Sequence, residues 1–275
     1  MSLKLQVFKL ATFVSVCLTS GAQPMRVAHL ALDDARPVYK AIRELEKRYG
    51  WSMTYEDPPF EHASELRDAT HPDYKRAHPN EAPALLPKQH RLNFTFKIPQ
   101  DDADEPDLED TIGALLASHK ASANPGFFAF DHIGAVVHVH PVQMKKQNGQ
   151  IAEFRSIMGT AVSFPKAKRS AFDTLLMILS QVSEGSQHPI SLGNIPTNGL
   201  MTSSGEHEAY NRPAREVLIE VIDDINRFNM EVFNHPAHIV WDLLYDPTFK
   251  SYFFNAHFIT VEKKGPFGAT VREPR

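Results

Sequence analysis

Residues Asp33–Asp57, DDARPVYKAIRELEKRYGWSMTYED, open with a helix pattern. Their apolar residues recur three and four positions apart, which is the spacing of one helix face. A proline in the first turn and Gly50 after the last turn are usual start and stop signals. Asp33 and Asp34 are placed to cap the start. We therefore expect a helix over 35–49.

The next seven residues read WSMTYED, in which Trp, Met and Tyr alternate with polar residues. This alternation is typical of a half-buried strand, expected over 51–55. The same order returns near the C-terminus, where a helix pattern over 212–228 precedes WDLLYDP and an expected strand over 241–245. We interpret the two segments as copies of one unit, with Trp51 and Trp241 at equivalent places.

The middle of the chain carries the opposite order, in which a strand pattern precedes a helix pattern. The expected elements here are strands over 92–98, 127–131, 135–140 and 159–164 and helices over 106–119 and 170–183. Ser170 and Asp173 match a capping box at the start of the last helix. The sequence therefore predicts an α+β fold of repeated small strand–helix–strand units with short antiparallel sheets.

The first 22 residues match a secretory signal peptide. Lys4 and Lys9 precede an apolar run at 10–18, and small residues follow at 20–22. The apolar run is too short to cross a bilayer, which takes about 20 residues. We therefore expect export to the periplasm or beyond, and no later segment reaches membrane-spanning length.

Cleavage is expected close to Ala22. Mass spectrometry of protein from the envelope fraction should then find an N-terminus near Gln23. An intact Met1 on the mature protein would contradict the signal-peptide interpretation.

A proline-rich stretch over 68–87 is expected to form a linker or exposed loop. The expected organisation is a signal peptide at 1–22, a helix–strand unit with the proline-rich loop at 23–90, a strand–helix–hairpin unit at 91–158, a strand–helix and helix–strand unit at 159–262, and a polar tail at 263–275.

Composition excludes several classes of protein. Cys17 is the only cysteine and lies in the signal segment, so the mature chain would have no thiol for disulfides, clusters or catalysis. The formal net charge is −4 and no basic stripe is present, which argues against a nucleic-acid partner. Common nucleophile, zinc-protease and phosphate-loop motifs are absent. We therefore expect a protein that is not an enzyme and has no cofactor.

His138 and His140 are the sharpest candidates for a metal site. Residues two apart on a strand share a face, so both imidazoles could meet one ion. His132, His71 or Glu206 could supply a third ligand, but a structural zinc site needs four ligands and a catalytic one three, and the sequence places only two. The alternative to a metal site, which we favour, is that both histidines lie on a solvated strand face and bind no metal.

Three other patterns can be explained without a functional site. Ser163 and Lys166 match Ser-x-x-Lys but lack the partner motifs of penicillin-binding enzymes. The acidic run Asp101–Asp110 lacks the glycine of a calcium loop and is expected to solvate a loop and cap the next helix. The Trp and Tyr pairs at 51–55 and 241–245 could form ligand platforms, but alternating aromatics on a strand usually face the core.

Two strands that end in FKIP and VSFP and are each followed by a helix resemble the opening of the short N-terminal domain of secretins and TonB-dependent receptors. The segments AIRELEKRYGWSMTYEDP and WDLLYDP resemble the next portion of that domain. This resemblance implies a small α+β interaction module of the bacterial periplasm, a protein partner in the cell envelope and no catalytic residues.

Two classes of function remain open. The first is a non-catalytic periplasmic binding or adaptor protein that pairs a strand edge with a partner. The second is a metal- or ligand-binding protein, or a hydrolase, that uses the His138/His140 face.

Overall fold

The computed structural model describes residues 25–100, 105–233, 238–264 and 270–274. The expected signal peptide at 1–22 lies outside the described residues. The last strands β14 (Thr260–Lys264) and β15 (Thr270–Pro274) pair with each other, and this pairing extends into the expected polar tail at 263–275.

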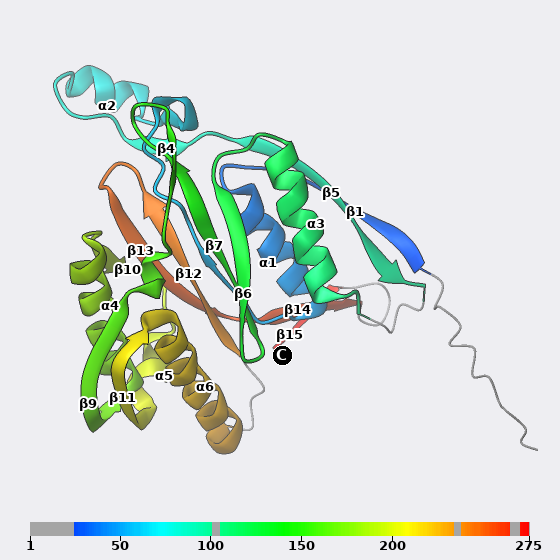
Figure 1. Cartoon of the computed structure of the whole chain (residues 1–275), viewed down its shortest axis with the longest axis vertical. Coiled ribbons are helices and arrows are strands. Elements are labelled where there is room, and N and C mark those ends of the chain that lie inside the picture. The colour runs from blue at the N-terminus through cyan, green and yellow to red at the C-terminus, as the bar shows by residue number, and fades with distance from the viewer. Residues whose placement is uncertain (1–24, 101–104, 234–237, 265–269, 275) are drawn as a thin grey trace, which may run out of the picture.

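A seven-stranded mixed sheet forms the middle of the fold (Figure 1). Its strand order is β10-β13-β12-β2-β7-β6, and β8 pairs with β7. In chain order its strands are β2 (Met53–Glu56), β6 (Phe127–Ile133), β7 (Val136–Lys145), β8 (Ile151–Glu153), β10 (Ile190–Leu192), β12 (Ile239–Asp246) and β13 (Ser251–Phe258). The two central strands, β12 and β2, run parallel, with Asp242 paired to Tyr55.

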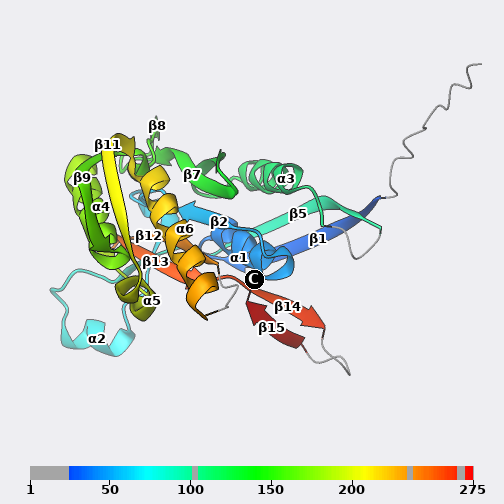
Figure 2. The same ribbon diagram turned by 90° about the horizontal axis from the view of Figure 1, so that it is seen from below.

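Two long helices and a two-stranded antiparallel ribbon cover each face of this sheet. One face carries α1 (Pro37–Tyr49), α3 (Leu108–Ala121) and the ribbon of β1 (Met25–Asp34) with β5 (His90–Pro99). The other carries α4 (Ala171–Ser186), α6 (Ala214–Phe233) and the ribbon of β9 (Ala161–Ser170) with β11 (Ser204–Pro213). Figure 2 shows the two groups on opposite sides of the central strands. The sheet therefore separates two hydrophobic cores.

One small structural unit occurs four times along the chain. Each unit is a ribbon strand, a helix and a sheet strand: β1-α1-β2, β5-α3-β6, β9-α4-β10 and β11-α6-β12. Units pair through their ribbon strands, the first with the second and the third with the fourth. The predicted α+β fold with repeated strand–helix–strand units and short antiparallel sheets is confirmed. The central mixed sheet, which joins strands from distant parts of the chain, was not predicted.

All four predicted helices are present, and α6 continues five residues beyond its predicted end at 228. Gly50 ends α1 in the left-handed conformation, with φ of 66°. The Ser170 hydroxyl accepts a bond from the Asp173 backbone N–H at the start of α4. The expected capping by Asp33 and Asp34 is wrong, because both belong to β1 and Arg36 is the N-cap of α1.

All six predicted strands are present with shifted ends, but the long strands β1, β11 and β13 were missed, as were six shorter strands of the described chain. Strand β1 was not predicted because its apolar and polar residues do not alternate cleanly. Leu30 is its only buried residue, so the sequence carries little of the usual strand pattern. The proline-rich stretch is largely exposed, as expected. It contains the short helix α2 (Pro72–Ala77), and its ends pair as β3 (Leu66–Asp68) with β4 (Leu85–Pro87).

Trp51 and Trp241 are both core residues, with 9% and 1% of their surface exposed. They pack into different cores, on opposite faces of the sheet. The cause is register: Asp242 pairs with Tyr55, so the alternating residues around Trp241 face away from the side that Tyr55 faces. Each tryptophan lies in the core that contains the helix preceding it, and the ligand-platform alternative is wrong.

Candidate functional site

The His138 and His140 side chains lie on the α4/α6 side of β7. Their rings are stacked, with centroids 5.4 Å apart and an interplanar angle of 14°. The predicted shared face is therefore confirmed. The expectation that this face is solvated is wrong: His138 is fully buried, and its ring lies 5.1 Å from that of Trp241.

His138 has one polar partner on the neighbouring strand β2. Its Nδ1 lies 2.9 Å from the Thr54 hydroxyl, whereas its Nε2 has no hydrogen bond and is 3.9 Å from a Glu56 carboxylate oxygen. Burial lowers the pKa of His138 well below its ordinary value, and the nearby His140 and Arg215 lower it further. The ring is therefore neutral at physiological pH.

Glu56 holds the segment that follows β8 against the sheet. Its fully buried carboxylate accepts hydrogen bonds from the Ser156 hydroxyl at 2.6 Å and the Ile157 backbone N–H at 2.7 Å. Burial raises the pKa of Glu56 to about 7, although these hydrogen bonds act in the opposite direction. Ile157 begins the short 3-10 helix η2 (Ile157–Gly159).

Asp131 joins β6 and β7 to the first turn of α6. Its carboxylate forms an ion pair with Arg215, 2.9 Å from Nη2, and lies 3.2 Å from His140 Nε2. Arg215 Nε and His140 Nε2 are buried and make no hydrogen bond. The cluster thus contains donor capacity that the surrounding protein does not use.

A pocket of about 660 Å³ opens beside this cluster. His140 and Arg215 line it together with Arg155, Ser156 and His188. These residues come from β7, the start of α6, the segment after β8 and the loop after α4. Sequence reasoning missed Arg155, His188 and Arg215, because no local pattern indicates that these distant segments meet.

The described residues do not complete a metal site. No group of three or more His, Cys, Asp or Glu side chains in the described ranges could hold an ion. The three proposed third ligands lie elsewhere: His132 pairs with Glu109, Glu206 pairs with Lys166, and His71 caps the start of α2.

We expect that added zinc leaves the melting temperature unchanged. A zinc site would need a third ligand within about 2.0–2.2 Å of the ion, and binding to the native state alone would raise stability. Thermal unfolding with micromolar zinc, and with a chelator, tests this. A zinc-dependent rise that vanishes in His138→Ala would contradict it.

His138 should make stability fall at acid pH. Its folded-state pKa lies below the unfolded value, so the unfolded chain binds the proton first as the pH drops below about 6.5. Between about pH 7.5 and about pH 5 the parent should therefore lose more stability than His138→Asn, which has no imidazole to titrate. Urea unfolding of both proteins measures the difference, and equal losses would contradict the neutral buried state.

Other motifs from the sequence do not assemble into a site. Ser163 lies on β9, where its hydroxyl accepts a bond from the Asn211 backbone N–H, and Lys166 pairs with Glu206. In the acidic run, Asp107 caps α3, as expected for part of that run, while residues 101–104 lie outside the described ranges.

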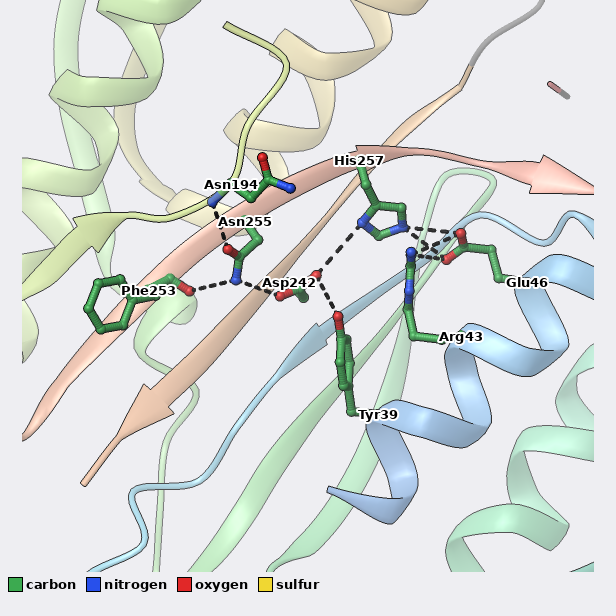
Figure 3. Close-up of polar contacts among 8 residues, drawn as sticks. All are labelled: Tyr39, Arg43, Glu46, Asn194, Asp242, Phe253, Asn255 and His257. Carbon is green, nitrogen blue, oxygen red and sulfur yellow. Dashed lines mark hydrogen bonds and ion pairs between the residues drawn. The ribbon is translucent and has the colours of Figure 1, made fainter. Parts of the chain in front are cut away.

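A second buried polar network lies on the opposite face and was also missed by sequence reasoning (Figure 3). His257 of β13 lies between two carboxylates, with Nε2 3.1 Å from Glu46 and Nδ1 3.7 Å from Asp242. Tyr39 donates to Asp242, and Arg43 donates to both oxygens of Glu46. Burial raises the pKa of Glu46 to about 7 and of Asp242 to about 6, and lowers that of His257 to about 3. The network ties α1 to β12 and β13.

Comparisons with known proteins return no match: no family model, no curated protein and no solved structure matches the chain. The resemblance to secretin and TonB short N-terminal domains therefore stays a prediction. None of the helices in the described parts of the chain is both long and apolar enough to cross a membrane.

Proposed function

We propose that this chain is a non-catalytic binding protein of the bacterial periplasm that holds a small polar ligand in the pocket beside His140 and Arg215. The observation that carries the proposal is this pocket of about 660 Å³ next to buried polar atoms that make no hydrogen bond. Ligand sites typically measure about 300–1,000 Å³ and contain a few convergent polar groups. The N-terminal export pattern supports the location.

Among the described residues that line this pocket there is no activated nucleophile, which supports binding rather than hydrolysis at this site. A serine hydrolase needs a hydroxyl hydrogen-bonded to a basic imidazole. The Ser156 hydroxyl instead donates to Glu56, and His188 Nδ1 lies 2.8 Å from the backbone oxygen of Ser186. Burial also lowers the pKa of His140 below its ordinary value, which weakens it as a base.

Ligand-observed NMR against a library of periplasmic metabolites tests the proposal. Gly159 lines the pocket, and an added Cβ there would meet no heavy atom within 4 Å, so a side chain can start at this position without a clash at its Cβ. Gly159→Trp is designed to fill the pocket. Gly113→Trp is the matched control, because Gly113 has the same free space but lies in α3 on the other face. Ligands should bind the parent and the control and not Gly159→Trp. Ligand binding that is equal in all three would overturn the proposal.

An adaptor function is a second candidate, because β1 presents an open strand edge. In the described part of the chain β1 pairs with β5 alone, and Val27 is 72% exposed. An unpaired edge is a template for strand addition by a partner. A photo-crosslinker at Val27 should capture an envelope protein, whereas one at the equally exposed Phe249, at 70%, should not. Equal capture at both positions would argue against strand addition.

A further inference from the structure

The pocket is cationic although the chain as a whole is acidic. The formal net charge of the chain is −4. The charged side chains that line it are those of Arg155 and Arg215, and no Asp or Glu is among the lining residues. The other polar groups are the hydroxyls of Ser156, Thr160 and Ser186 and the imidazoles of His140 and His188. A water-accessible concavity with one sign of charge concentrates ligands of the opposite sign.

The two arginines keep donor groups free for a ligand. Arg155 is exposed and has no hydrogen-bond or ion-pair partner among the described residues. Arg215 uses Nη2 for Asp131, and about a fifth of its side chain, 21%, stays exposed. A guanidinium presents paired N–H groups that match the oxygens of a carboxylate or phosphate. Arg215 is thus paired with Asp131, and Arg155 has no counter-ion among the described residues.

The size and walls of the pocket indicate an organic ligand rather than an inorganic ion. Its volume of about 660 Å³ far exceeds that of a phosphate ion, and Phe154 and Ile157 contribute apolar surface beside the charged groups. The His188 ring packs edge-on to Phe154, with centroids 6.3 Å apart, and extends this wall. A ring or short chain on the ligand would pack here while its charged group meets the arginines.

We infer that the ligand is a small organic oxyanion, whose carboxylate or phosphate group is bound by Arg155 and Arg215 and whose apolar part packs against Phe154. This inference rests on the proposed function of the pocket and adds the chemical class of its ligand.

Calorimetric titration with four probes of similar size tests the inference: phenyl phosphate, benzoate, benzyl alcohol and benzylamine. The proteins are the parent, Arg155→Met, the pocket-filling Gly159→Trp, and Arg67→Met. Arg67 is an exposed residue of β3 outside the pocket, so its replacement removes the same charge elsewhere. Thermal unfolding of each variant confirms that it is folded.

The two anions should bind the parent and Arg67→Met, and Arg155→Met should weaken them about tenfold, as expected for loss of a charge-assisted contact. Their relative affinities then distinguish a phosphate site from a carboxylate site. Benzyl alcohol and benzylamine should bind more weakly and not respond to Arg155→Met.

Two results would overturn the inference, and they have different consequences for the proposed function. If benzyl alcohol binds as tightly as the anions and only Gly159→Trp blocks it, the pocket binds ligands but not by charge. If no probe distinguishes the parent from Gly159→Trp, the oxyanion site is absent. The proposed function then fails as well if the metabolite library gives the same result.

Discussion

Replacing Trp241 by alanine is expected to lower the free energy of unfolding by about 3–5 kcal/mol, the usual cost of truncating a large core aromatic. Trp241 lies on a central strand and is 1% exposed. Its ring stacks on Phe254 at 5.9 Å and packs against His138 at 5.1 Å. The loss is a packing effect, because its Nε1 makes no hydrogen bond.

Urea unfolding of Trp241→Ala and of Phe249→Ala measures this effect. Phe249 is 70% exposed, so its truncation should change stability by no more than about 0.5 kcal/mol. Trp51→Ala should cost about as much as Trp241→Ala, because Trp51 stacks on Tyr49 at 4.8 Å in the opposite core. A loss below about 1 kcal/mol in either tryptophan variant would contradict the core assignment.

Arg36→Met is expected to cost about 3–5 kcal/mol, because it leaves a buried carboxylate without its counter-charge. Asp57 is fully buried and lies 2.5 Å from Arg36 Nε. It also accepts bonds from the Tyr55 hydroxyl at 2.8 Å and the Tyr245 backbone N–H at 3.0 Å. Burial raises the pKa of Asp57, and Arg36 opposes this shift. The pair joins the start of α1 to both central strands.

An exposed ion pair provides the control. Lys75 and Asp68 lie 2.7 Å apart, but 65% of the lysine side chain is exposed, so Lys75→Met should cost less than about 1 kcal/mol. Replacing Arg36 and Asp57 together by apolar residues should cost less than Arg36→Met alone, since no unpaired charge then stays buried. Equal losses for Arg36→Met and Lys75→Met would show that the buried pair is not important for stability.

Long periodic segments were predictable, and irregular or weakly buried ones were not. The apolar stripe of α1 and the alternating apolar residues of β5 each arise because one side of the element packs on one core. A pattern within a short stretch of sequence is therefore enough to predict each element. Strand β1 has a single buried residue, and its pairing with β5 joins Met25 to Pro99, far along the chain. Strand formation there depends on its partner, which no local window contains.

The candidate site was predictable only in part. The two-residue spacing of His138 and His140 correctly placed both rings on one face. Spacing does not tell which face of a strand is covered, and here the side chains of Trp241 and of Arg215 lie against the His138 ring. Arg155 and His188 meet in the pocket from separate segments, so their joint role is visible only after folding.

The sequence by itself determined the four long helices, six of the strands and the repetition of a small strand–helix–strand unit, because each depends on side-chain spacing within a short window. Only the tertiary structure decided that β2 and β12 lie side by side. It also decided that Trp51, just before β2, and Trp241 of β12 pack on opposite faces of the sheet. It also placed a cationic pocket beside Asp131 and Glu56. These features depend on strand register and on contacts such as that between Asp57 and Tyr245, 188 residues apart. Such contacts are selected by the packing of the whole chain, and local periodicity carries no information about them.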